Sequence, residues 1–240
     1  MTHNYSDETR HRLFDKINYL EATHDIAAVP HEFNPKFYPS EAELRWAKAL
    51  KGTMSGKMVV WGVNGSSVHK VYPWTQIVAK WLAERGFHVV LTGDAVQGKE
   101  FQNAILDALK KTDIDMAYLH PMAGELTIRQ TLTLAQVADC VVGPETGLLN
   151  AVAHENVPKV IMLSHSTADN LTKHWKNVTV LSADRAKVGC SGCHRLHYDW
   201  TYCPQDEETN AALCASAIKP SLIMDAILSY IATKKKPLAA

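Results

Sequence analysis

Residues 141–163, VVGPETGLLNAVAHENVPKVIML, have the pattern of a buried strand, a short helix and a second buried strand. The first apolar run ends in Gly-Pro-Glu-Thr-Gly, an Ala-rich segment follows, and a proline precedes the second run. Upstream, KMVVWGV (57–63) and FHVVLTG (87–93) predict two more strands, with a helix between Pro73 and Gly86. Strands that alternate with helices of about 10–15 residues indicate right-handed βαβ units. The sequence therefore predicts an α/β fold with a doubly wound parallel sheet.

The rest of the sequence predicts further strands and helices of the same fold. Further strands are predicted at 115–120, 139–143, 158–164 and 178–182, and further helices at 97–111, 126–138 and 221–235. Residues 8–22 predict a helix with Leu13, Ile17 and Leu20 on one face, and Ser40 with Glu43 forms a capping box that starts another helix. We expect a helical extension and linker over 1–51 and one domain over 52–240, with a Cys-rich insertion at 186–215.

Composition excludes several classes of function. The 240 residues contain 25 Lys and Arg and 25 Asp and Glu, so no charge excess indicates a nucleic acid or an anionic membrane as partner. No apolar run approaches the roughly 20 residues that cross a bilayer, and the N-terminus lacks the apolar core of a signal peptide. We therefore expect a cytoplasmic protein whose thiols are reduced.

Three polar loops follow strands at the edge where such sheets bind ligands: 64–70, 143–147 and 164–167. In the first loop, Gly65 allows close backbone approach, Ser66 and Ser67 supply hydroxyls, and Lys70 supplies a charge suited to phosphate. The loop matches neither the dinucleotide-binding fingerprint nor the P-loop. A solvated turn with one surface lysine is the alternative.

The loop at 143–147 places Glu145, Thr146 and Gly147 before a helix. We expect Thr146 to cap that helix and Glu145 to project above the sheet edge, where a carboxylate accepts hydrogen bonds from a sugar or ribose diol. The alternative is that both residues serve the helix N-terminus alone. The run Ser164-His165-Ser166 is interpreted as the rim of the pocket, and no catalytic residue is assigned.

Four cysteines lie within 25 residues: Cys190, Cys193, Cys203 and Cys214. In a reducing compartment, four thiolates at this spacing are candidate ligands of a structural zinc ion, with His194 and His197 as substitutes. Buried free thiols, or disulfides in an exported protein, are the alternatives. Cys140 is expected in the core.

The motifs NGSSVHKVYPW (64–74), LTLAQVADCVVG (132–143) and PETGLLNAVA (144–153), with the C-x2-C tail, resemble glycosyltransferase family nine, the heptosyltransferase-like enzymes. The resemblance covers about residues 30–232 and corresponds to the C-terminal half of the family, the Rossmann-like half of a GT-B fold. It implies that Ser66, Ser67 and Lys70 contact the diphosphate of a nucleotide sugar, and that Thr146 and Gly147 present backbone N–H groups to it. Two positions depart from the family: Glu145 replaces an aspartate, and Asn150 replaces a histidine and joins the donor-binding set.

The resemblance implies a glycosyltransferase that moves a sugar from a nucleotide-diphosphate donor to a saccharide acceptor such as a lipopolysaccharide, without a cofactor for transfer. The family's N-terminal half carries the acceptor site, and the 56 residues before the first predicted strand cannot build it. A partner chain or a homo-oligomer is therefore expected to supply that half, with the protein in the cytoplasm or peripheral at the inner membrane. A non-catalytic nucleotide-sugar-binding module and a zinc-stapled interaction domain are the rival functions.

Overall fold

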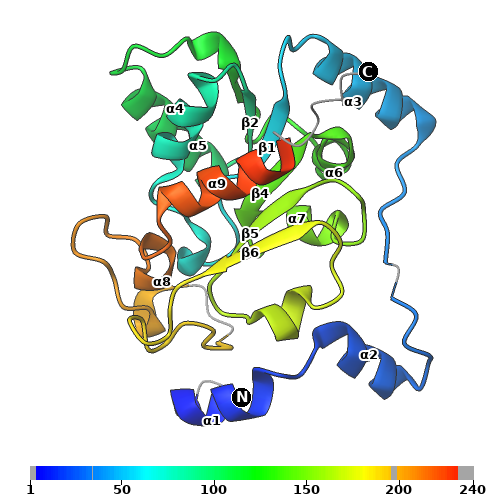
Figure 1. Cartoon of the computed structure of the whole chain (residues 1–240), viewed down its shortest axis with the longest axis vertical. Helices are drawn as coiled ribbons and strands as arrows, with labels where there is room; N and C mark the ends of the chain where they lie inside the picture. The colour runs from blue at the N-terminus through cyan, green and yellow to red at the C-terminus, as the bar shows by residue number, and fades with distance from the viewer. Residues whose placement is uncertain (1–3, 34, 196–198, 232–240) are drawn as a thin grey trace, which may run out of the picture.

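A six-stranded, entirely parallel sheet forms the centre of the molecule (Figure 1). The computed structural model describes residues 4–33, 35–195 and 199–231. The strand order is β3-β2-β1-β4-β5-β6, so the chain reverses its direction of travel between β1 and β4. The strands are β1 (Met58–Gly62), β2 (His88–Thr92), β3 (Leu119–Pro121), β4 (Cys140–Pro144), β5 (Lys159–Leu163) and β6 (Val178–Ser182). The predicted doubly wound parallel sheet is confirmed.

Helices cover both faces of the sheet because the strand side chains alternate between two cores. Val59 and Trp61 point into one core, which α4 (Thr75–Ala83), α5 (Gln97–Leu109) and α9 (Pro220–Ile231) complete. Met58 and Val60 point into the other, which α3 (Glu41–Gly52), α6 (Ile128–Val137) and α7 (Gly147–Ala151) complete. Shorter helical turns are η2 (Val68–Lys70), η3 (Met116–Tyr118), η4 (Ala168–Thr172), η5 (Trp200–Tyr202) and α8 (Leu213–Ser216). Burial on both faces explains why the strands are continuous apolar runs.

Helix α3 belongs to the packed layer. The predicted capping box is present: Ser40 Oγ accepts from the Glu43 backbone N–H, and Glu43 accepts from the Ser40 N–H at 2.6 Å. Ala47 is fully buried, and Lys51 Nζ donates to the Val137 carbonyl of α6 at 2.8 Å. The predicted division at residue 51 therefore does not separate α3 from the core.

The single helix predicted over 8–22 is wrong. The segment forms two helices, α1 (Asp7–Phe14) and α2 (Tyr19–Ala27), because Asn18 caps a new helix by accepting from the backbone N–H groups of residues 20 and 21. Leu13 and Ile17 are 40% and 47% exposed, so they form no buried helix face. We call residues 7–27 the N-terminal arm.

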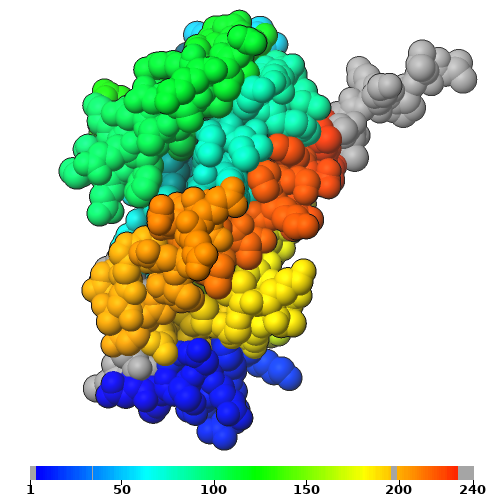
Figure 2. Space-filling view, turned by 90° about the vertical axis from the view of Figure 1, so that its left-hand side faces the viewer, coloured from blue at the N-terminus to red at the C-terminus, as the bar shows by residue number. Residues whose placement is uncertain are grey.

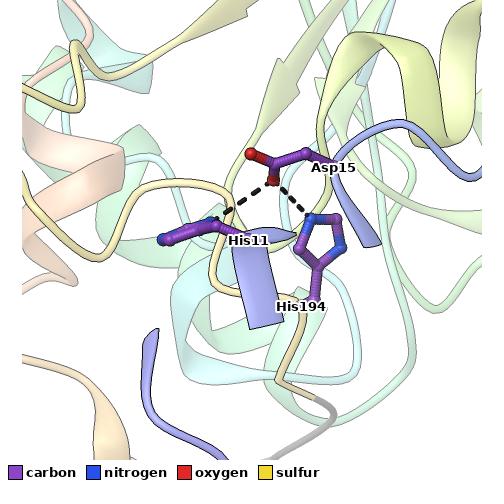
Figure 3. A group of neighbouring side chains, drawn as sticks. All are labelled: His11, Asp15 and His194. Atoms are coloured by element: carbon purple, nitrogen blue, oxygen red, sulfur yellow. Dashed lines mark hydrogen bonds and ion pairs between the residues drawn. The ribbon is translucent and has the colours of Figure 1, made fainter. Parts of the chain in front are cut away.

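The N-terminal arm lies across the carboxyl end of the sheet, against residues 164–195 (Figures 1 and 2). Asp15 accepts from Arg185 at 2.7 Å and from His194 at 2.9 Å, and His11 lies 3.3 Å from the same carboxylate (Figure 3). The fully buried Arg10 donates to the Cys193 carbonyl at 2.6 Å. These long-range contacts fix the arm in place without a large apolar face.

Two ends of predicted elements differ from the structure. The strand predicted at 115–120 is a 3-10 turn followed by three strand residues, and the closing helix ends at Ile231. The predicted residues beyond 231 lie outside the described part of the chain. Within the described ranges, no helix combines the length and the apolar character that crossing a bilayer requires.

Candidate functional site

Two of the three polar loops predicted from the sequence, 64–70 and 143–147, meet at the point where the strand order reverses. Strands β1 and β4 are hydrogen-bonded neighbours, with Trp61 opposite Val142, so their carboxyl ends and the loops that follow lie side by side. A β-carbon built on Gly65 would lie 2.7 Å from Lys70 Cδ and 3.1 Å from Thr146 Cγ2, which shows how closely the loops approach. Open α/β sheets bind ligands at such a reversal point.

The first loop presents one lysine that forms no ion pair with any described residue. Ser66 is exposed, Ser67 is nearly buried, and Lys70 is half-buried. Burial lowers the pKa of Lys70, and the negative charge of Glu145 opposes this shift. Within the described residues, the Lys70 ammonium makes no hydrogen bond or ion pair. A half-buried ammonium without a partner is suited to bind an anion.

The second loop presents unused hydrogen-bonding groups. Thr146 is at the N-cap position of α7, but its hydroxyl makes no capping bond, so the expected cap is wrong. Its Oγ1 is instead buried and has no partner in the described structure. A β-carbon on Gly147 would meet nothing within 4 Å, and the side chain of Asn150, one turn further, is exposed.

Glu145 does not project above the sheet edge, contrary to the expectation from sequence. Its side chain is buried, and Oε1 accepts from the backbone N–H groups of Ser164 at 2.8 Å and Ser166 at 3.0 Å. Its other oxygen pairs with Nδ1 of His165. Burial raises the pKa of Glu145, but His165 and the two N–H groups outweigh it, so the pKa is lowered and the carboxylate is charged. With both oxygens engaged, the carboxylate is not directed at a diol.

Sequence reasoning missed two polar groups of this edge. The sequence places His165 at the rim of the pocket, but its side chain is the partner of the buried Glu145 carboxylate. On the other side of the loops, Asn64 donates to Asp94 at 2.7 Å, and Asp94 also accepts from the Gly98 N–H at 3.1 Å. The available signal was position alone, since each of these residues directly follows a predicted strand.

The four predicted cysteine ligands line one cavity beside His165. None of the four forms a disulfide within the described residues. Burial raises the pKa of each thiol, and that of Cys203 reaches about 12. Thiols with a raised pKa are protonated and uncharged at pH 7. His197, the predicted substitute ligand, lies outside the described residues.

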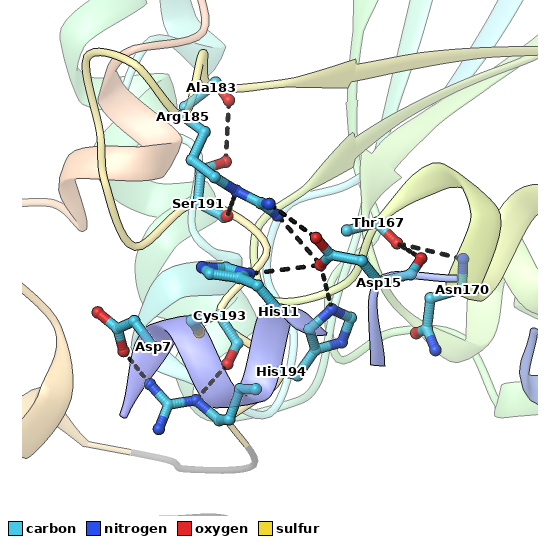
Figure 4. Close-up of polar contacts among 11 residues, drawn as sticks. Asp7, His11, Asp15, Thr167, Asn170, Ala183, Arg185, Ser191, Cys193 and His194 are labelled. Carbon is cyan, nitrogen blue, oxygen red and sulfur yellow. Dashed lines mark hydrogen bonds and ion pairs between the residues drawn. The ribbon is translucent and has the colours of Figure 1, made fainter. Parts of the chain in front are cut away.

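The thiols form a loose cluster. Among the residues that the structure describes, one group of three ligand-type side chains has its ligand atoms within 4.8 Å of one another, and this is His11, Asp15 and His194 (Figure 3). In that group the carboxylate already binds the Arg185 guanidinium (Figure 4), whose charge opposes a second cation. The cysteines would therefore have to move closer together to bind a common ion.

Comparisons with known proteins agree with this fold. The sequence model of the family named glycosyltransferase family 9 (heptosyltransferase) matches residues 7–195 of this chain. The structure is similar to ADP-heptose LPS heptosyltransferase II of E. coli, at 20% identity and a TM-score of 0.66, over 88% of this chain and 57% of that chain. It is also similar to a family 9 glycosyltransferase of Veillonella parvula, at 10% identity and a TM-score of 0.62, over 88% of this chain and 58% of that chain.

A third similar structure is that of TibC, a dodecameric iron-containing heptosyltransferase of enterotoxigenic E. coli, in complex with ADP-D-beta-D-heptose. The identity is 15% and the TM-score 0.61, over 93% of this chain and 57% of that chain. A search of curated proteins finds no match. The chain thus spans less than two thirds of the length of these solved structures. The family match covers most of the chain, and the chain belongs to glycosyltransferase family 9 (heptosyltransferase).

Proposed function

We propose that the edge formed by β1 and β4 binds a nucleotide-diphosphate sugar, which the protein uses as donor in glycosyl transfer. Ser66, Ser67 and Lys70 would contact the diphosphate from one loop, and Thr146 and Gly147 from the other. Asn150 would reach the sugar or phosphate from the next turn of α7. The donor complex of TibC, a structure of similar fold, supports this class of ligand.

The observation that carries the proposal is the state of Lys70. Lys70 is half-buried at the reversal point, and its ammonium forms no ion pair among the described residues. Its aliphatic stem and the Thr146 side chain both lie beside Gly65. Removing a charge from water without compensation is costly, and a bound diphosphate would provide the compensation. Loss of this contact would weaken binding.

The buried Glu145 carboxylate is compatible with a bound anion. Two backbone N–H groups and His165 already bind this carboxylate and stabilise its charge. Its repulsion of a diphosphate is therefore smaller than that of a free carboxylate. We accordingly replace the proposed diol contact of Glu145 by a supporting role: it holds the loop after β5 and the His165 ring beside the donor.

Transfer to an acceptor is the second part of the proposal. The similar structures are longer than this chain, so we propose that protein outside residues 1–240, from a partner chain or a second copy, completes the GT-B enzyme. The dodecameric state of TibC makes self-association a reasonable form of this idea. A lipopolysaccharide-like acceptor and a location in the cytoplasm or at the inner membrane remain predictions from the sequence.

Isothermal titration with ADP-, GDP- and UDP-sugars tests donor binding. We expect one of these to bind, and we expect Lys70→Met to weaken that affinity at least about tenfold. Lys99→Met is the matched control, because Lys99 pairs with Glu125 at 2.8 Å on the exposed side of α5. Absence of binding at millimolar concentration to folded protein would refute the proposal. Binding that never leads to transfer, with any partner fraction, would favour the non-catalytic module instead.

We also propose that Cys190, Cys193, Cys203 and Cys214 hold one structural metal ion, zinc or iron. Four thiols line one cavity and would form, on moving closer together, the tetrahedral sulfur set that both metals accept, and TibC contains iron. Elemental analysis should find about one ion per chain. Cys190→Ser should lose it, whereas Cys140→Ala, which alters a core thiol on β4, should retain it. Metal-free, fully folded wild-type protein would exclude the ion and the zinc-stapled interaction domain together.

A further inference from the structure

The segment that carries two of the four cysteines packs against the loop proposed to hold the diphosphate. Residues 203–218 contain Cys203, then α8 with Cys214, and then the turn before α9. Helix α8 lies against η2, the turn that ends at Lys70. We call residues 203–218 the α8 segment. It joins the proposed metal site and the proposed donor site in one packed unit.

Two hydrogen bonds tie the α8 segment to the chain just after η2. The hydroxyl of Tyr72, a residue that is 5% exposed, donates to the backbone carbonyl of Ile218 at 2.8 Å. The indole Nε1 of Trp74 donates to the backbone carbonyl of Ser216 at 3.0 Å. Breaking such a bond inside the protein leaves a polar group without a partner, which is costly. The chain at 72–74 and the end of α8 therefore move together.

His69 forms a third link, because it lies on η2 directly before Lys70 and contacts a cysteine. It is 4% exposed, and its Nδ1 lies 4.0 Å from Cys203 Sγ. The cavity that His69 lines is the one that all four cysteines line. Lys70 and Ala215 of α8 line a small neighbouring cavity together. The position of Lys70 in the donor site thus depends on the position of α8.

A metal ion shared by the cysteines would act on these three links. The thiols form a loose cluster, so loading requires the cysteines to move closer together. A four-coordinate sulfur site fixes the positions of its ligands, and Cys203 and Cys214 would then hold both the start of the α8 segment and α8 itself. With α8 fixed, its contacts restrict the loop that contains Lys70. A loop that is ordered in advance loses less entropy when it binds a ligand.

We propose that the cysteine site regulates the donor site: an ion bound by the cysteines orders residues 64–74 and raises the affinity for the nucleotide sugar. His69, Tyr72 and Trp74 are the positioning residues that connect the two sites, and they act on the donor through Lys70. The inference rests on the metal ion and the donor proposed above. Coupling between two binding sites is reciprocal, so the donor raises the affinity for the ion by the same factor.

Hydrogen exchange of the backbone amides tests the link without any donor. The full chain after chelation is compared with the same chain loaded with Zn²⁺ or Fe²⁺. In the loaded wild type, we expect the peptide over 64–74 to exchange at least about fivefold more slowly, since a local opening is suppressed. The same peptide of Cys190→Ser should not change, because that variant should not hold the ion.

A double variant separates the link from the ion. Tyr72→Phe with Trp74→Phe removes both hydrogen-bond donors and keeps two aromatic rings. It should retain the ion in elemental analysis but lose most of the protection at 64–74, and Tyr72→Phe alone, which lacks one oxygen atom, should lose part of it. Tyr230→Phe is the matched control, because its hydroxyl lies 3.0 Å from Thr179 Oγ1, between α9 and β6. Circular dichroism confirms that each variant is folded.

Titration calorimetry with the nucleotide sugar that binds wild type measures the effect on the donor. Chelation should weaken its affinity at least about fivefold in wild type and in Tyr230→Phe. In the double variant the affinity should be weak with or without the ion. Conversely, saturating nucleotide sugar should raise the affinity of wild type for Zn²⁺, measured against a competing chelator, by the same factor.

Four results would overturn the inference: a protein that binds no ion, an ion that leaves the exchange of 64–74 unchanged, full protection of this peptide in the double variant, or equal protection of β2. The last result would mean general stabilisation. A nucleotide sugar that binds equally well with and without the ion refutes this inference alone. If no nucleotide sugar binds while the ion protects 64–74 through Tyr72 and Trp74, the proposed donor fails and the link between the two loops stands.

Discussion

Lys159 is a fully buried lysine at the start of β5, and it makes the stability of the protein depend on pH in a calculable way. Its ammonium donates to the backbone carbonyls of Glu155 at 2.9 Å and Lys176 at 2.6 Å. Burial lowers its pKa from 10.5 to about 8, against the opposing attraction of Glu155 and Cys140. The folded state therefore keeps this group protonated only at a cost in free energy.

The size and the sign of the effect follow from that shift. A difference of 2.5 pKa units between 10.5 and about 8 corresponds to about 3 kcal/mol. The Lys159 ammonium donates to the backbone carbonyl of Lys176, an exposed residue at the end of the sheet. Nearby water screens the charge there, so we expect a change in the free energy of unfolding of about 2 kcal/mol. Between pH 8 and 10.5 the unfolded chain binds more protons than the folded chain at this site, so stability from Lys159 rises with pH across that window and is constant below it.

The variant Lys159→Met tests this reasoning, because it keeps the apolar stem and removes the charge. Urea unfolding gives the free energy of unfolding of both proteins at each pH. From pH 7 to about pH 10 this free energy should rise by about 2 kcal/mol more in wild type than in the variant. The two carbonyls left without a donor add a constant offset that does not depend on pH. Lys48→Met, at an exposed position of α3, should show no such change. Parallel pH profiles for wild type and Lys159→Met would refute the assignment.

Three further predictions concern packing, the arm and the donor site. Gly98→Ala should destabilise by about 1–3 kcal/mol in urea unfolding, since its new β-carbon would lie 2.7 Å from the backbone just after β2; Gly52→Ala, with nothing within 4 Å, should not destabilise. Asp15→Asn should speed proteolysis of the arm at pH 7. In wild type the guanidinium and imidazole partners outweigh burial and lower the pKa of Asp15 from 3.8 to about 2, so its stabilisation is present above pH 3.8 and the arm should loosen only as pH falls towards 2. Gly65→Ala should weaken donor binding in titration calorimetry by displacing Lys70, whose Cδ would lie 2.7 Å from the added carbon, and unchanged affinity would contradict the placement of that lysine.

Local patterns predicted most of the scaffold correctly. Continuous apolar runs such as 57–63 and 87–93 became parallel strands, and Ser40 with Glu43 formed the capping box that its spacing indicated. Because the carboxyl ends of parallel strands share one edge, the sequence also placed Lys70 and Glu145 on the same edge, and the charge of Glu145 does act on Lys70. The same patterns could not predict the direction of the Glu145 side chain, which depends on the N–H groups after β5.

The amino-acid sequence by itself thus determined the layered α/β architecture and the loops that carry its polar chemistry, because periodicity, capping and turn residues act within a few positions of the chain. Only the tertiary structure decided that Glu145 is buried against His165 and that the N-terminal arm is held at Asp15 by Arg185. The structure alone likewise decided that this arm forms one wall of a cavity, with α7 and the segment around η4 opposite it. Glu145 accepts from backbone N–H groups 19 and 21 positions away, and Asp15 pairs with Arg185, 170 positions away. Contacts over such separations leave no local pattern in the sequence.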